Sequence, residues 1–370
     1  MRNAKSLIAL AGAVALALTF TPLFADGGAA HQVKQATPVK MGTSGGSIAD
    51  IGRLYCCGGT AGSLITRDGT RYVLSNNHIF ARSGSAVAGE NDIQPGLIDE
   101  SCSTNPSVYN IIGTYPGNVV PLGTANVDVG LSTANTSVVD TTGSIIDVGV
   151  PCSATQVAGI GAAVTKSGRT TGQTFGTVQA TNVSVSIQYQ KGCVQGKKFT
   201  ISYTNQVSIT PGTFSGGGDS GSLILSNNTS NHHPVALLYA GSSSVTIGNP
   251  IADVVAALNA GGHSTSFVGN GACGTGTTPI GGSVESASLL HGPSANDVDF
   301  ARTIKERHEP DLFARSGVIG VGVGADDTDA TQAVIVVYVD NTGGKVAHGL
   351  PAELDGVKVK VVPTDPFVAR

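Results

Sequence analysis

The sequence predicts an all-β domain, a barrel or a sandwich that ends in a helix, followed by a small α+β module. Short runs rich in Val, Ile, Thr and Tyr alternate with turn residues over most of the chain, and 51 of the 370 residues are Gly. Helical periodicity in this part is convincing only where Ile251, Val254, Val255 and Leu258 share one face. Charge then rises: from Asp297 onward 20 of 74 residues are charged, against 26 of the 296 before. Two differently built units are therefore expected.

The elements follow from these patterns in chain order. In the first unit, strands are predicted over residues 62–65, 71–75, 127–131, 163–166, 176–180, 183–189, 199–203, 222–225, 235–240 and 245–247, before a helix over 251–259. The tail is predicted to hold an amphipathic helix over 298–312 and strands over 317–324, 333–340 and 357–362.

Composition also divides the chain into segments. Residues 1–25, or 1–30, are typical of a secretory signal peptide, because Arg2 and Lys5 precede an apolar stretch. Four segments follow: an N-terminal segment over 26–44, the β domain over 45–265, a Gly-, Ser- and Thr-rich linker over 266–296, and the α+β module over 297–370. The protein is expected to be secreted, extracellular or periplasmic, without membrane attachment once the signal is removed.

The overall charge excludes some function classes. With 21 basic and 25 acidic residues, the chain lacks the excess of Lys and Arg that a phosphate-tracking surface requires, so no nucleic-acid partner is expected. A hydrophobic fraction of 40% with only 12% charged residues argues against disorder. The oligomeric state is not specified by the sequence.

The six cysteines form an even set, which in an exported protein predicts disulfides. Fifteen full pairings are possible. Adjacent cysteines rarely satisfy disulfide geometry with each other, so Cys56 and Cys57 are expected to reach different partners. A zinc site is disfavoured because no C-x-x-C pair occurs, and no metal is expected. The set is Cys56, Cys57, Cys102, Cys152, Cys193 and Cys273.

The sharpest local motif is the glycine-rich octamer Ser215–Ser222, in which Ser220 is a candidate nucleophile. Glycines on both sides leave room for a substrate to approach closely. Backbone N–H groups of Gly218 and Ser220, if aimed into one concavity, would stabilise a negative oxygen. The alternative for the octamer alone is a Gly-rich surface hairpin.

A Ser hydroxyl needs a base, and a base needs an orienting carboxylate. His78 follows a predicted strand and is the candidate base. Asp128 lies between apolar residues, where an unpaired carboxylate would be destabilising, and is the best candidate carboxylate. Asp140 and Asp147 are rivals in more turn-like settings.

The chain order of the three candidates is His78, Asp128 and Ser220. This is the order of base, carboxylate and nucleophile in chymotrypsin-like serine proteases. Gly218–Gly221 matches the nucleophile motif of that family, and Val164–Gly172 is similar to a segment of its bacterial, α-lytic-type branch. Leu74–Ala81 and Leu237–Pro250 are most similar to the narrow-leaf-type trypsin-like proteases of plants and their bacterial relatives. Over residues 57–259 the sequence therefore resembles the chymotrypsin/trypsin-like (PA clan) family.

This resemblance implies two six-stranded Greek-key barrels, with the base and carboxylate from the first and the nucleophile from the second. No Ile-Val-Gly-Gly activation terminus is evident, so a buried Asp219 needs another cation. The position that matches the Arg of the bacterial branch is Lys166, and Arg169 is the substitute. By position relative to the nucleophile, the resemblance also places Phe214 at the base of the specificity pocket and residues 239–241 along one wall. The specificity pocket is thus expected to include Phe214, Tyr239 and Gly241, with a small or apolar side chain as its ligand.

The preferred hypothesis is a secreted serine endopeptidase that acts on protein or peptide substrates with no metal or organic cofactor. Alternatives are a catalytically silent protein of the same fold, or an esterase in which Ser44 of a G-x-S-x-G motif works with Asp128 and His232. Sequence context argues against the esterase, because no strand precedes Ser44 and no helix follows it. The tail is expected either to restrain activity, assist folding or recruit a partner, or only to add stability.

Overall fold

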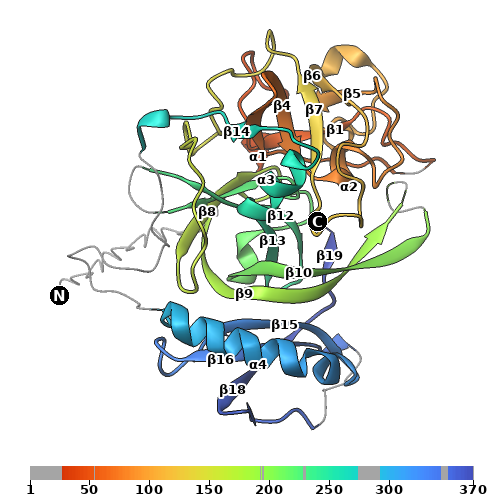
Figure 1. The fold of residues 1–370 in the computed structure, drawn as a ribbon. Coiled ribbons are helices and arrows are strands. Elements are labelled where there is room, and N and C mark those ends of the chain that lie inside the picture. Colours follow the sequence, from red (N-terminus) through yellow and green to blue (C-terminus); the bar gives the residue numbers. More distant parts are fainter. Residues whose placement is uncertain are drawn as a thin grey trace, which may run out of the picture.

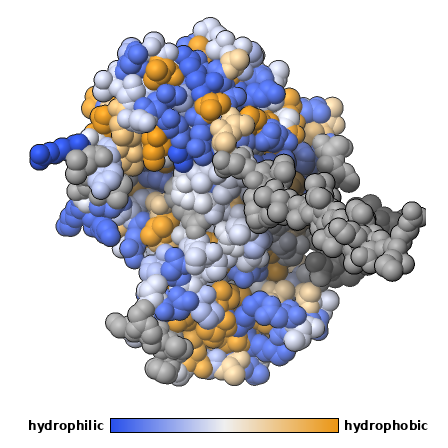
Figure 2. Space-filling view, turned by 180° about the vertical axis from the view of Figure 1, so that it is seen from behind, coloured by the Kyte–Doolittle hydropathy of each residue, from blue (hydrophilic) through white to orange (hydrophobic). Residues whose placement is uncertain are grey.

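The computed structural model describes residues 27–53, 55–191, 193, 196–227, 231–273, 292–342 and 349–369. The predicted signal peptide over residues 1–25 and most of the predicted linker therefore lie outside the described residues. The described chain forms two β-sheets packed side by side, with the tail module beneath the second sheet (Figure 1). The space-filling view from behind shows the tail as the lower part of the molecule, with a group of apolar residues on its surface (Figure 2).

The first sheet is a curled sheet of eight strands in the order β14-β3-β4-β7-β6-β5-β1-β2. All of its pairings are antiparallel. Its strands are β1 (Thr43–Ser47), β2 (Gly59–Ala61), β3 (Ser63–Arg67), β4 (Thr70–Ser75), β5 (Asn91–Gln94), β6 (Asn110–Thr114), β7 (Gly130–Ala134) and β14 (Thr265–Phe267). A short helix, α1 (Ala29–Gln32), precedes them, and short helical turns connect some of them: α2 (Asn77–Phe80), η1 (Leu97–Glu100) and η2 (Pro106–Val108).

The second sheet has 11 strands, six of which close into a barrel because β9 pairs with both β8 and β10. Its strands are β8 (Ala163–Gly168), β9 (Gly172–Gln190), β10 (Lys198–Thr210), β11 (Leu223–Ser226), β12 (Pro234–Gly241) and β13 (Thr246–Pro250), with η3 (Gly212–Phe214) before the glycine-rich loop. Helix α3 (Ile251–Asn259) follows, at the predicted bounds, and buries Ile251, Val254 and Leu258 in a core shared by both sheets. The predicted all-β class with a barrel and a terminal helix is confirmed.

The tail module extends the second sheet rather than folding beside it. It contains α4 (Ala295–Phe313), β15 (Val318–Ala325), β16 (Ala333–Asp340), β17 (Glu353–Leu354), β18 (Val357–Thr364) and β19 (Val368–Ala369). Strand β15 pairs antiparallel with the middle of β9, and β16 pairs with β15 on its far side. Helix α4 covers one face of these strands, while the other face packs on the barrel. The predicted α+β composition of the tail is confirmed.

Three disulfides brace the fold: Cys56–Cys102, Cys57–Cys193 and Cys152–Cys273. The expectation that the two adjacent cysteines have different partners is confirmed. The third disulfide, together with β14 and η4 (Gly271–Cys273), shows that residues 266–273, the start of the predicted linker, are fixed to the body of the fold. In the part of the chain that is described, no helix combines the length and apolar character needed to span a bilayer.

Candidate active site

The candidate base and carboxylate meet beside the short helix α2. β4 ends at Ser75 and α2 begins two residues later, which places His78 on the first turn of that helix. Asp128 comes just before β7, rather than inside a strand, and is fully buried. Its carboxylate accepts hydrogen bonds from the backbone N–H of Asn77 (2.7 Å) and of His78 (3.3 Å), and its Oδ2 lies 2.6 Å from His78 Nδ1. The carboxylate thus fixes both the start of the helix and the imidazole ring.

The rival carboxylates lie elsewhere. Asp140 accepts hydrogen bonds from Thr142 in an exposed turn. Asp147 pairs with the buried ring of His31 at 2.8 Å. Of the three carboxylates considered from sequence, Asp128 is the one in contact with His78.

Tyr189, to which no sequence pattern points, reaches this pair from β9 of the barrel. Its hydroxyl donates to Asp128 Oδ2 at 3.0 Å and lies 2.7 Å from the hydroxyl of Tyr203. Its ring makes an edge contact with His78, with the ring centres 5.9 Å apart. Burial raises the pKa of Tyr189 well above its usual value, so the hydroxyl remains a neutral donor. No motif marks this residue, since its partner lies 61 positions away in the sequence.

The glycine-rich loop places Ser220 beside the first sheet. The backbone oxygen of Ser220 accepts from Thr60 N at 2.8 Å in β2. Gly218 and Gly221 have φ of +100° and +94°, and a Cβ on Gly221 would lie 2.3 Å from the carbonyl oxygen of Thr60. The loop therefore needs glycine at both positions.

The side chain of Ser220 has no exposed surface, and its Oγ donates to the carbonyl oxygen of Tyr239 at 3.1 Å. The hydrogen bonds found among the described residues do not include one between Ser220 and His78. Nor, within the same part of the chain, do the backbone N–H groups of Gly218 and Ser220 donate to a protein acceptor. Gly59 of β2 links the two sides, because a Cβ there would lie 2.6 Å from the side chain of Ile79, the neighbour of His78, and 3.1 Å from the backbone oxygen of Ser220. Ser220 thus lies near the helix that carries His78, with its hydroxyl turned toward β12.

The aspartate before Ser220 is held by the predicted lysine. Lys166 Nζ lies 3.3 Å from Asp219 Oδ2, and neither side chain has exposed surface. The carboxylate also accepts from Thr170 N (2.8 Å), Thr171 Oγ1 (2.7 Å) and Gly216 N (2.8 Å), and so ties β8 to the glycine-rich loop. Burial lowers the pKa of Lys166, and attraction to Asp219 opposes that shift.

Arg169, the substitute cation, pairs instead with Asp99, to which its Nε donates at 2.8 Å. The same carboxylate accepts the hydroxyl of Ser44 at 2.5 Å. Ser44 is fully buried inside β1, which pairs with strands on both sides, so it does not sit at a strand-to-helix turn. His232 contacts the backbone of Ser226, so the structure does not bring the residues of the esterase hypothesis together.

The residues predicted to form the specificity pocket are mostly internal. The Phe214 ring is 1% exposed and packs in the core of the barrel. Tyr239 is also fully buried, and its ring makes an edge contact with Tyr203. Gly241 ends β12 and pairs with Val368 of the tail. Their roles in specificity remain predictions.

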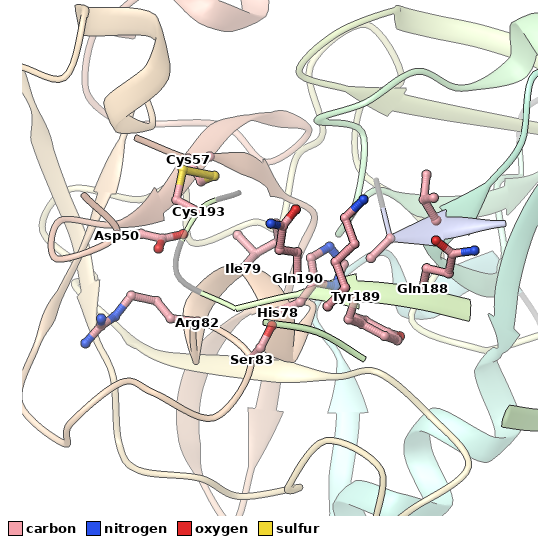
Figure 3. A pocket seen from close by; sticks show the side chains of 14 residues that line it. Asp50, Cys57, His78, Ile79, Arg82, Ser83, Gln188, Tyr189, Gln190 and Cys193 are labelled. Atoms are coloured by element: carbon pink, nitrogen blue, oxygen red, sulfur yellow. A yellow bond between two sulfur atoms is a disulfide. The ribbon is translucent and has the colours of Figure 1, made fainter. Parts of the chain in front are cut away.

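A cavity of about 290 Å³ opens next to the candidate base (Figure 3). His78 lines it from the side of the first sheet and Tyr189 from the barrel, and Asp50 and Arg82 line it as well. Burial raises the pKa of Asp50 to about 6. The cavity lining is completed by Cys57, Gly58, Ile79, Ser83, Gln188, Gln190, Cys193, Lys198, Val368 and Ala369.

Among solved structures, 49 chains match this chain, and serine proteases are among them. A glutamic acid-specific serine protease is 21% identical over 62% of this chain and 100% of its own, with a TM-score of 0.40. Thermobifida fusca protease A is 16% identical over 63% and 99%, with a TM-score of 0.39. An α-lytic protease homolog, N4, is 19% identical over 60% and 97%, with a TM-score of 0.37. No protein-family model and no curated protein matches the chain.

Proposed function

We propose that the protein is a secreted serine endopeptidase that hydrolyses peptide bonds through an acyl-enzyme. The observation that carries this proposal is the buried carboxylate of Asp128 at 2.6 Å from His78 Nδ1, in the same region as a serine set in a glycine loop. A fully buried carboxylate is unfavourable unless it is paired, and here it fixes the ring that a serine nucleophile would need. The three disulfides support an oxidising, extracellular or periplasmic location.

In this proposal Ser220 rotates its hydroxyl away from β12 toward His78. Its Oγ then attacks the carbonyl carbon of the scissile peptide bond while its proton passes to His78 Nε2. The N–H groups of Gly218 and Ser220 stabilise the negative oxygen that forms, each by about 3 kcal/mol. His78 returns the proton to the leaving amine, and a water molecule repeats the sequence to release the acid. Asp128 keeps the proton-bearing Nδ1 of the ring directed at its own oxygen.

Labelling with a fluorophosphonate probe tests this function. The wild-type protein should be labelled in a long incubation, and Ser220→Ala should lose the label. Ser44→Ala is the matched control, because it removes a buried hydroxyl in the first sheet and should leave labelling intact. Loss of the label in Ser44→Ala instead would favour the esterase. If the folded wild-type protein takes up no label, the proposal is wrong and a silent, binding role is favoured.

A further inference from the structure

The last described residues of the tail return to the candidate active site. We call residues Thr364–Ala369, which begin at the last residue of β18, the C-terminal strap. Its end forms β19, in which Ala369 pairs antiparallel with Ala240 and Val368 with Gly241 of β12. On its other side Val368 lies opposite Gln188 of β9. Figure 1 shows β19 at the junction between the two sheets.

This position is directly beside the candidate nucleophile. Tyr239 immediately precedes Ala240 in β12, and its carbonyl oxygen accepts a hydrogen bond from the Ser220 hydroxyl at 3.1 Å. Val368 and Ala369 also form part of the wall of the cavity that His78 lines. The strap therefore pairs with the strand whose Tyr239 carbonyl binds the hydroxyl of the proposed nucleophile. It also lines the cavity next to the proposed base.

An extended peptide can bind to an exposed strand edge such as that of β12 by adding a further strand to the sheet, held by main-chain hydrogen bonds. The strap already makes that addition at residues 240 and 241 of β12. In this arrangement Ser220 has no exposed surface. A peptide substrate and the strap would thus need the same edge, and one must leave before the other binds.

Within its described residues, the strap is held firmly as far as Phe367 and by fewer contacts in β19. Phe367 is fully buried against Tyr338, with ring centres 5.6 Å apart, and its carbonyl oxygen accepts from Gln188 N at 3.0 Å. Asp365 accepts from Ser243 N at 2.7 Å. The β19 residues, in contrast, are only partly covered.

The loop after β12 adds to this anchor, because the Thr364 hydroxyl lies 2.7 Å from that of Ser244 and 2.6 Å from that of Ser242. Beyond the anchor, Val368 is 42% exposed, and within the described residues two pairs join β19 to β12 and one joins it to β9. An end held by so few contacts can open while its anchor stays in place.

We propose that the strap is an intramolecular inhibitor of the proposed protease, occupying the peptide-binding edge of β12 until it is displaced. This inference rests on the proposed function. Of the roles considered for the tail, the restraint of activity is then exerted by a short segment that competes with substrate for one strand edge. The pairing of β15 with β9 holds the module where the strap reaches the cavity lined by His78.

The test is the rate of fluorophosphonate labelling in the full chain. Phe367→Ser removes the anchor and should raise the rate more than about tenfold, since truncating a buried Phe favours the detached strap. Phe300→Ser is the matched control, because it makes the same change in the tail at a ring that is 55% exposed, and it should label at the wild-type rate. Asp365→Ala weakens the anchor without opening the core and should give a smaller increase.

A free peptide of residues 364–369 should slow the labelling of Phe367→Ser again, whereas a scrambled peptide should not. If wild type, Phe367→Ser and Asp365→Ala all label at one rate, the inference is wrong while the proposed function stands. If the free peptide has no effect on the released variant, competition for the β12 edge is wrong. If no form takes up label although all are folded, the proposed function fails, and the inference with it.

Discussion

Replacing Lys166 by Met should destabilise the protein and slow its proposed chemistry. The Lys166–Asp219 pair has no exposed surface on either side, so the substitution leaves a buried carboxylate without its cation. Breaking such a pair by removing one partner typically costs about 3–5 kcal/mol. Asp219 would keep its hydrogen bonds from Thr170, Thr171 and Gly216. We therefore expect a loss of unfolding free energy at the lower end of this range, about 3 kcal/mol.

Urea unfolding followed by circular dichroism measures this loss. The control is Lys358→Met, which removes a surface pair with Asp326 from a lysine that is half exposed and should have little effect. The double variant Lys166→Met/Asp219→Asn should recover part of the loss, because the neutral amide no longer needs a cation. A change in unfolding free energy no larger than that of the control would refute the reasoning.

The same variants test the link between this pair and catalysis. Asp219 sits between Gly218 and Ser220, whose N–H groups are proposed to bind the negative oxygen, and it is tied to β8 through Lys166. Loss of that tie should lower the labelling rate of Lys166→Met in the Phe367→Ser background. Full labelling at the unchanged rate would mean that the loop is held without the lysine.

Three further predictions concern stability. Tyr189→Phe removes a hydrogen bond to the buried Asp128 and should lower the unfolding free energy by about 2 kcal/mol in urea titrations; no change would mean that this bond adds nothing. Burial raises the pKa of Asp92 to about 8, so between about pH 4 and 8 the folded state holds a proton that the unfolded state has lost, and stability falls as pH rises through that window. Asp92→Asn should remove this slope and be more stable than the wild type at pH 7 by up to about 4 kcal/mol. Parallel profiles of unfolding free energy against pH would contradict this prediction. Replacing both Cys152 and Cys273 by Ser opens a link across 121 residues and should cost about 3–5 kcal/mol in thermal unfolding, whereas a loss below 1 kcal/mol would exclude a major role.

Local sequence patterns were sufficient to predict the bounds of elements that are flanked by clear turn residues. Helix α3 spans the predicted residues because an apolar stripe ends at paired glycines. The tail strands β15, β16 and β18 begin within one residue of their predicted starts. In contrast, the strands expected over 176–180 and 183–189 are parts of one continuous strand, β9. Asn182 has a φ of +49°, which resembles a turn, but its side chain bonds to Asn205 across the hairpin and the strand continues through the irregularity.

Sequence patterns predict only those residues of the candidate site that carry a local signal. The signal is a glycine-rich loop for Ser220, a strand end for His78 and apolar neighbours for Asp128. Tyr189 and the strap carry none, since each depends on a contact with a residue far away in the chain. A two-residue strand such as β19 has no periodicity to detect, and its pairing follows from where β18 ends.

The junction between the tail and β9 decides how the role of the tail can be tested. Residues 180–185 of β9 lie between β10 and β15, and Val183 and Val185 are buried there. Lys305 of α4 reaches Ser184 in the same stretch at 3.0 Å. A chain ended before the tail would therefore expose an apolar sheet edge with unpaired backbone groups, which favours aggregation. We expect such a truncation to give an aggregation-prone protein, measurable as oligomers in light scattering, while Phe367→Ser stays monodisperse. Because removal of the tail changes stability and the strap together, a truncated chain that labelled faster would not by itself identify the strap, whereas the single anchor substitution does.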